Sequence, residues 1–147
     1  MRLSEAIRLG AMLRPQAKGR LFHEGGSCAI GAAYEALGLV KKLDDNLDTG
    51  CGVSRLMPTV YPWLTSLYRG CPHDEKCAEW SLSTAHTFHA LIPHLNDDHS
   101  WTREQIADWV EQQEQKLEQE EKEREQQKVA SAVPVAVGAV GVSSEAV

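Results

Sequence analysis

The chain has 147 residues, of which 42% are hydrophobic and 24% charged, and its formal net charge is −6. This composition is typical of a globular protein with one modest core, and the acidic balance argues against a partner bound through nucleic-acid phosphates. No apolar run reaches the roughly 18 residues that span a membrane, and the N-terminus does not resemble a secretory leader. We therefore expect a cytoplasmic protein in which the cysteines are free thiols or metal ligands rather than disulfides.

The N-terminal part of the chain predicts two helices joined by a turn. Ser4 is a plausible N-cap for a first helix, which Pro15 must end. Ser27 follows a pair of glycines and is expected to cap a second helix that stops at Gly38. The glycine pair also predicts a short hairpin near residues 20–30.

The middle of the chain predicts two more helices. Pro62 fits the first position of a helix that extends to Gly70, with an apolar stripe that includes Leu67. Residues 81–92 carry apolar side chains at helical spacing, and Pro93 should end or kink that helix. Both helices would present an apolar face to the core.

Segment 94–110, HLNDDHSWTREQIADWV, holds the clearest local signal. Thr102 and Gln105 have the spacing of a capping box, in which each side chain bonds the backbone N–H of the other residue. Trp101 and Ile106 flank this box as a hydrophobic staple. The pattern predicts a helix that starts after Thr102, with the preceding polar residues as the elbow that sets its direction.

The composition changes beyond this helix start. Residues 118–128 are rich in Glu and Gln and cannot bury an apolar face, so we expect a charged helix that projects into solvent. Residues 129–147 have low complexity and are expected to be disordered. The globular domain would then be residues 1–117, a mostly all-α, compact bundle of about five helices. The predicted core comprises Ile7, Ala11, Ile30, Tyr34, Leu37, Trp63, Leu67, Phe88, Ile92, Leu95, Trp101, Ile106 and Trp109.

Four residues have a spacing that favours a metal site. Cys71 and Cys77 form one pair, and His94 and His99 form a second pair further along the chain. Zinc in structural sites takes four Cys and His ligands in a tetrahedron, usually as two short-spaced pairs. The sequence therefore predicts zinc as the cofactor, with these four ligands and His73 as the alternate. In the competing interpretation, the same side chains are ordinary core, loop and cap residues.

A different interpretation assigns chemistry to Cys28. This cysteine lies at the expected start of a helix, where the helix dipole favours a thiolate. A cysteine hydrolase would use such a thiol together with a histidine elsewhere as its base. The surrounding small residues equally fit a packing helix in which Cys28 fills the core. No catalytic residue is therefore assigned.

Two further patterns are incomplete. Asn96, Asp97 and Asp98 offer oxygen ligands, but the glycine and the distal glutamate of a calcium loop are missing, and Asx residues are common before helices. The helix after Thr102 has a pattern of polar and apolar residues similar to that of the first helix of a helix-turn-helix, yet no recognition helix is predicted after it. The acidic tract that follows instead would be repelled by phosphates.

Three stretches resemble, in this order, small proteins of bacteriophages and prophages: LSEAIRLGAMLRPQ, GSCAIGAAYEALG and HLNDDHSWTREQIADWV. The resemblance covers most of residues 1–110. It implies a Cys-Pro-X-Cys pair ahead of the HLND motif, whereas this chain reads Cys71-Pro72-His73-Asp74. Either His73 or Cys77 substitutes for the second cysteine, or the metal has been lost. The resemblance implies a phage or prophage setting and supplies no catalytic residues.

Together these observations predict a small phage- or prophage-type accessory protein that binds another protein and is stabilised by zinc. The sequence contains no complete set of catalytic residues that we recognise, so it favours a role other than that of an enzyme. The alternatives are a cysteine hydrolase, using Cys28 with a downstream histidine, and a structural component of the virion. A phage origin would place the protein in the cytoplasm of the host cell, without membrane contact.

Overall fold

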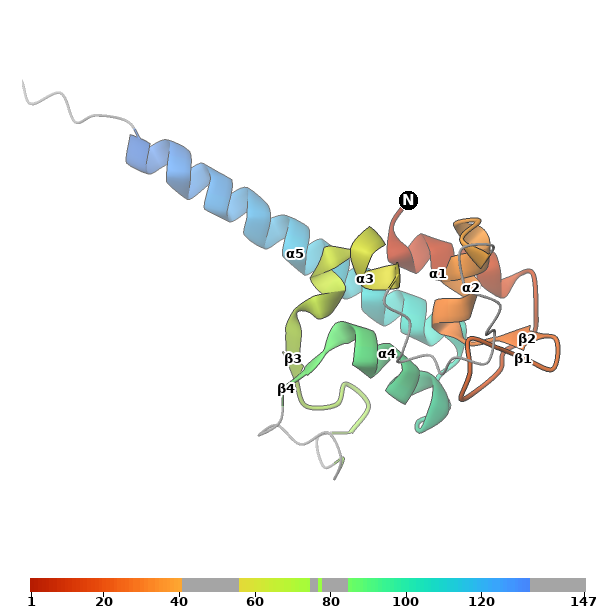
Figure 1. The fold of residues 1–147 in the computed structure, drawn as a ribbon. Helices are drawn as coiled ribbons and strands as arrows, with labels where there is room; N and C mark the ends of the chain where they lie inside the picture. Colours follow the sequence, from red (N-terminus) through yellow and green to blue (C-terminus); the bar gives the residue numbers. More distant parts are fainter. Residues whose placement is uncertain (41–55, 75–76, 78–84, 133–147) are drawn as a thin grey trace, which may run out of the picture. The chain divides into compact units, whose positions relative to one another are not determined.

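The computed structural model describes residues 1–40, 56–74, 77 and 85–132. Within these residues the chain forms five α-helices and two small two-stranded sheets, which confirms the mostly all-α prediction (Figure 1). The elements are α1 (Leu3–Ala11), β1 (Phe22–His23), β2 (Gly26–Ser27), α2 (Ala29–Ala36), α3 (Leu56–Val60), the 3-10 helix η3 (Pro62–Thr65), β3 (Leu67–Arg69), β4 (Ala85–Thr87), α4 (Phe88–Asp97) and α5 (Arg103–Ala132). The chain divides after Glu114 into two units, so α5 begins in the first unit and continues into the second.

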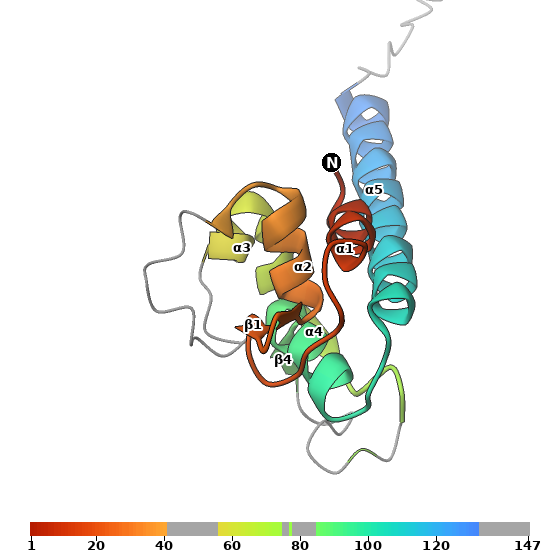
Figure 2. The same cartoon turned by 90° about the vertical axis from the view of Figure 1, so that its right-hand side faces the viewer.

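The close approach of α1 to α2 depends on Gly10. A Cβ atom at this position would lie 1.8 Å from the carbonyl oxygen of Ala32, so only glycine fits the contact. Both helices contribute fully buried side chains, including Ile7 from α1 and Ile30 from α2. Figure 2 shows α1 lying between α2 and the first turns of α5. The N-terminal helix is therefore enclosed on two sides.

The first turns of α5 cap both ends of α1. At the N-terminal end, the Glu114 carboxylate accepts hydrogen bonds from the backbone N–H of Leu3 and from the Ser4 hydroxyl, each at 2.7 Å. At the C-terminal end, the buried guanidinium of Arg103 donates to the carbonyl of Ala11 at 3.2 Å. A negative group at the start and a positive group at the end satisfy unpaired backbone groups and complement the helix dipole. These bonds fix the antiparallel packing of α1 on α5.

The expected hairpin is present, but the helix caps beside it differ from the prediction. Strands β1 and β2 pair antiparallel, with Phe22 opposite Ser27. Ser27 does not cap α2, because its side chain accepts a hydrogen bond from Arg103 at 3.0 Å. Cys28 is the N-cap, and its Sγ accepts from the backbone N–H of Gly31 at 3.4 Å. Similarly, Ser4 lies inside the first turn of α1 rather than at its cap.

The predicted helix from Pro62 to Gly70 is wrong. Helix η3 ends at Thr65, and the chain continues as β3, which pairs antiparallel with β4. Leu67, expected in the core, is 67% exposed because the side chains of a strand alternate between two faces. Its neighbour Tyr68 instead packs against Phe88, with 5.4 Å between ring centroids.

The next predicted helix starts and ends later than the sequence indicated. Residues 81–84 of the predicted helix lie outside the described residues, and Ala85–Thr87 form β4. The Thr87 side chain caps α4 by accepting from the backbone N–H of Ala90 at 3.3 Å. Pro93 lies inside the helix and does not end it, since α4 continues to Asp97. A proline removes one backbone hydrogen bond, and the buried residues on both sides of it hold the helix together.

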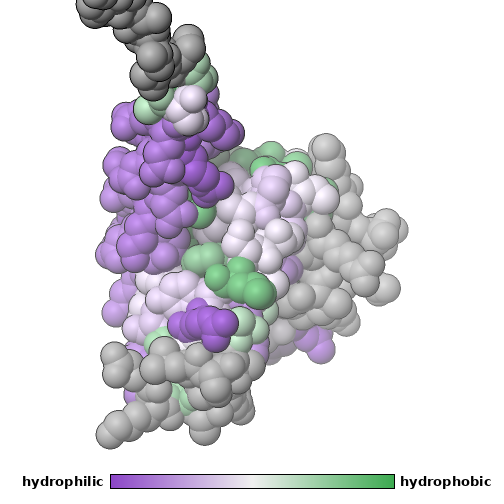
Figure 3. Space-filling view, turned by 90° about the vertical axis from the view of Figure 1, so that its left-hand side faces the viewer, coloured by the Kyte–Doolittle hydropathy of each residue, from purple (hydrophilic) through white to green (hydrophobic). Residues whose placement is uncertain are grey.

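Helix α5 starts where the sequence predicted. The backbone N–H of Thr102 donates to Gln105 Oε1 at 2.9 Å, and the N–H of Gln105 donates to Thr102 Oγ1 at 3.1 Å, which confirms the capping box. The helix is continuous to Ala132, and its hydrophilic surface is evident in Figure 3. Most of the low-complexity segment 129–147 lies outside the described residues. None of the described helices is both long and apolar enough to cross a membrane.

Candidate metal centre

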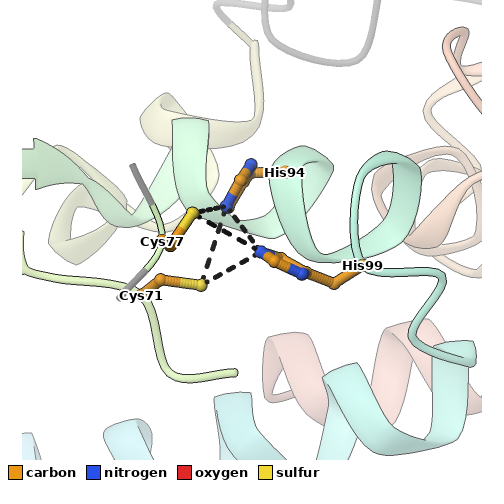
Figure 4. A group of neighbouring side chains, drawn as sticks. All are labelled: Cys71, Cys77, His94 and His99. Carbon is orange, nitrogen blue, oxygen red and sulfur yellow. Dashed lines mark hydrogen bonds between the residues drawn. The ribbon is translucent and has the colours of Figure 1, made fainter. Parts of the chain in front are cut away.

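The structure brings Cys71, Cys77, His94 and His99 together in one cluster. Their Sγ and imidazole nitrogen atoms all lie within 4.8 Å of one another. The cysteines come from the segment after β3, whereas His94 lies on α4 and His99 in the elbow between α4 and α5. The four side chains point toward a common centre, as Figure 4 shows.

The spacing of the donor atoms fits a tetrahedral zinc ion. With Zn–S of about 2.3 Å and Zn–N of about 2.05 Å, an ideal tetrahedron places two nitrogens about 3.3 Å apart and sulfur and nitrogen about 3.6 Å apart. The two Nε2 atoms are 3.1 Å apart. Cys71 Sγ lies 3.6 Å from His94 Nε2 and 3.3 Å from His99 Nε2. The corresponding distances from Cys77 Sγ are 3.6 Å and 3.8 Å.

A carboxylate outside the cluster orients His94. The Nδ1 atom of this histidine lies 2.7 Å from Asp98 Oδ2. An ionised carboxylate only accepts hydrogen bonds, so Nδ1 must carry the proton, and the neutral imidazole keeps a lone pair on Nε2. Carboxylates commonly hold metal-binding histidines in this way. From the sequence, Asp98 was expected to be an oxygen ligand or an ordinary residue before a helix, although its spacing of four residues from His94 would have indicated this role.

The environment of His99 favours the neutral imidazole that a metal requires. Burial lowers the pKa of His99, and the neighbouring His94 and His73 lower it further. The carboxylates of Asp98 and Asp74 act in the opposite direction. Because a ligating histidine must be deprotonated at the donor nitrogen, the lowered pKa prepares this side chain for metal binding at neutral pH.

His73, the alternate ligand, lies beside the cluster and is not one of its four members. Its Nδ1 accepts a hydrogen bond from Trp101 Nε1 at 2.9 Å. Its ring packs on that of His99, with centroids 4.4 Å apart. Cys77 therefore occupies the fourth corner, and His73 supports the ring of a neighbouring ligand.

Hydrogen bonds to the N-terminal segment hold the elbow that carries His99. The buried Asn96 donates from Nδ2 to the carbonyl of Ala17 at 2.9 Å. Asp97 Oδ1 accepts from the backbone N–H of Gly19 at 2.9 Å. Asn96, Asp97 and Asp98 thus have structural partners, because their side chains anchor the 16–19 segment and orient His94. This arrangement accounts for them without the oxygen-ligand site that the sequence left open.

Cys28, the candidate nucleophile, is fully buried. Its exposed fraction is 0%, and its sulfur caps α2 by accepting the hydrogen bond from Gly31. A thiol in this position packs in the core and is closed to a substrate. The structure therefore favours the packing interpretation of Cys28.

Comparison with known proteins adds no family to this picture. No protein-family model, no curated protein and no solved structure matches the chain. The chemistry of the cluster must therefore be judged from its own residues, and these residues form a Cys2His2 set suited to a metal such as zinc.

Proposed function

We propose that this chain is a small helical accessory protein that binds one structural Zn²⁺ through Cys71, Cys77, His94 and His99. The observation that carries the proposal is the convergence of the four donor atoms, which all lie within 4.8 Å of one another, with sulfur–nitrogen and nitrogen–nitrogen distances close to those of a tetrahedral zinc site. Two thiolates and two imidazoles form a complete zinc coordination sphere. The Asp98 carboxylate that fixes the tautomer of His94 adds the outer partner expected of such a site.

A structural role follows from where the ligands lie in the chain. The cysteines follow a short strand, whereas the histidines lie at the end of α4 and in the elbow before α5. An ion bound by all four side chains would join the segment after β3 to the end of α4 and the elbow. Without the ion, these segments are held together by short strands and core side chains. Zinc binding would then contribute directly to the folding free energy, as it does in other small zinc domains.

Protein binding, rather than catalysis, is the activity we propose. A catalytic zinc site keeps a coordination position open for water or substrate, whereas this cluster offers four protein ligands. The buried Cys28 likewise gives a cysteine hydrolase no accessible nucleophile. The phage or prophage setting, and with it the alternative of a virion component, rests on the resemblance of the sequence alone.

A shallow hollow beside the cluster offers a surface for a protein partner. It has a volume of about 350 Å³ and is lined by Pro72, Trp101, Gln105, Asp108, Trp109 and Gln112. Pro72 directly follows the ligand Cys71, and Trp101 is hydrogen-bonded to His73. Metal binding would thus order two walls of the hollow. Trp109 is buried, whereas Trp101 is partly exposed beside polar side chains, an arrangement typical of protein-binding surfaces.

Substitution of cobalt for zinc tests the proposed site directly. We expect Co²⁺ added to the metal-free protein to give the intense visible absorption of a tetrahedral ion and the near-ultraviolet charge-transfer bands of two thiolates. The variant Cys71→Ser should lose most of the charge-transfer intensity, and Cys28→Ser should retain it as the matched control. A spectrum of octahedral, sulfur-free Co²⁺ from the unmodified protein would contradict the proposal.

A further inference from the structure

The two cysteines of the cluster are close enough to react with each other. Their sulfur atoms lie within 4.8 Å, and five residues separate them in the sequence. The backbone N–H of Cys77 donates to the carbonyl of Asp74 at 3.1 Å. Cys71 is 7% exposed, whereas Cys77 is partly exposed. An oxidant in solution would therefore meet the sulfur of Cys77 first.

We infer that Cys71 and Cys77 form a redox switch that releases the metal when a peroxide oxidises them to a disulfide, an inference that rests on the proposed zinc site. A zinc ion holds both cysteines as thiolates, which are the reactive form toward peroxides and disulfides. It also holds the two sulfurs side by side. Rapid disulfide formation requires that a thiol is deprotonated and that the two sulfur atoms are held close together.

The reaction proceeds in two balanced steps. The Cys77 thiolate attacks one oxygen of hydrogen peroxide, so that an S–O bond forms, the O–O bond breaks and hydroxide leaves, which gives a sulfenic acid directly. The Cys71 thiolate then attacks the sulfur of Cys77, the S–S bond forms, and a second hydroxide leaves. Two thiolates lose two electrons in total, and the peroxide is reduced to two molecules of water once two protons are taken up.

Disulfide formation removes both anionic ligands at once. His94 and His99 are the remaining donors, and two neutral imidazoles hold zinc far more weakly than the full Cys2His2 set. The ion therefore dissociates, and it no longer links the segment after β3 to the elbow between α4 and α5. A cellular dithiol such as thioredoxin would reduce the disulfide and allow zinc to bind again.

The sequence makes the disulfide easy to identify. Trypsin cleaves after Arg69, Lys76 and Arg103, so Cys71 and Cys77 fall into different peptides, 70–76 and 77–103. A disulfide between them keeps these two peptides covalently joined until a reductant is added. The fully buried Cys28 should stay reduced and serves as an internal control. The substitution Cys51→Ser removes the remaining cysteine as a competing partner.

The experiment treats the zinc-loaded, full-length Cys51→Ser protein with increasing hydrogen peroxide. Released zinc is measured with a chromogenic chelator, and the joined peptides are quantified by mass spectrometry of a non-reducing digest. We expect zinc release and the 70–76/77–103 disulfide to appear in equal molar amounts, and we expect dithiothreitol to restore zinc binding. The Cys28→Ser variant should behave identically.

Two results would overturn the inference while leaving the proposed zinc site intact. One is zinc retained under peroxide at concentrations that oxidise a free thiol peptide. The other is zinc release accompanied by sulfinic acid at Cys71 or Cys77 with no joined peptides. A protein that takes up no zinc before oxidation would instead contradict the proposed function itself, so the two failures are distinguishable.

Discussion

His94 Nδ1 and Asp98 Oδ2 lie 2.7 Å apart, and this pair decides which nitrogen of His94 faces the cysteines. The side chain of His94 is 3% exposed, whereas that of Asp98 is 57% exposed. The carboxylate therefore reaches the buried ring from the surface. Asp98 is the C-cap residue of α4, four residues after His94, so the end of this helix sets the orientation of the ring. A substitution at this exposed position should act on the buried site.

Removal of the Asp98 carboxylate should weaken metal binding without removing a ligand. For Asp98→Ala we expect the zinc affinity to fall about 10–100-fold, the range typical of outer partners of metal-binding histidines. Competition with a chromophoric chelator measures the change. Asp97→Asn is the matched control, because it removes a neighbouring negative charge and keeps an oxygen for the N–H of Gly19. Equal affinities for Asp98→Ala and the unmodified protein would argue against an orienting role.

Substitutions at His73 and Cys77 should have different effects, since only Cys77 belongs to the cluster. We expect Cys77→Ser to lose stoichiometric zinc binding and His73→Ala to retain one ion per chain. Replacement of His73 should lower the affinity only modestly, through loss of its packing on His99. Zinc content after gel filtration measures both. Zinc lost from His73→Ala and kept by Cys77→Ser would assign the fourth ligand to His73.

The α1–α2 contact should tolerate no side chain at Gly10. In Gly10→Ala the added Cβ would meet the backbone of Ala32, and a backbone cannot rotate away as a side chain does. We expect the free energy of unfolding to fall by about 1–3 kcal/mol or more, as for other overpacked cores. Urea denaturation measures the loss. A free energy of unfolding unchanged within error would show that the two helices do not approach as closely as described.

Protonation of His89 should destabilise the protein in mild acid. Its Nε2 is buried without a hydrogen-bond partner among the described residues, and burial lowers the pKa of this histidine. The unfolded state then binds the proton more readily. The contribution to stability is thus present above the unfolded pKa of about 6.5 and is lost as the pH falls below it toward the folded pKa.

The variant His89→Leu isolates this contribution. Between about pH 7.5 and about pH 5.5, thermal melting should show a smaller loss of stability for the variant than for the unmodified protein. The metal-binding histidines are common to both proteins, so their protonation cancels in the comparison. Identical pH dependence in the two proteins would mean that His89 is not buried in its neutral form.

Local signals in the sequence were sufficient where the structure depends on near neighbours. The capping box of Thr102 and Gln105 could be predicted because both partners lie within one helical turn. The metal cluster could be predicted from ligand type and spacing, although its closure depends on how the fold brings distant segments together. The choice between His73 and Cys77 required the structure, since both lie a few residues from Cys71.

The errors arose where distant contacts override local pattern. The apolar spacing around Leu67 fits a helix, but pairing of β3 with β4 places this side chain in solvent. Ser27 has the preferred chemistry of an N-cap, yet its hydroxyl bonds Arg103 from a distant part of the chain, and Cys28 takes the capping position. Neither β4, the partner of β3, nor Arg103, the partner of Ser27, can be identified from the residues next to them in the sequence.

The zinc content of the purified, untagged protein is the first measurement to make, paired with thermal melting in the presence and absence of a chelator. We predict one zinc ion per chain, lost from Cys71→Ser, and a large fall in melting temperature when the chelator removes it. Protein that binds no zinc after supplementation, and that melts at the same temperature with and without chelator, would contradict the proposed zinc site. Cys71, Cys77, His94 and His99 would then be a packed cluster with no ion to hold.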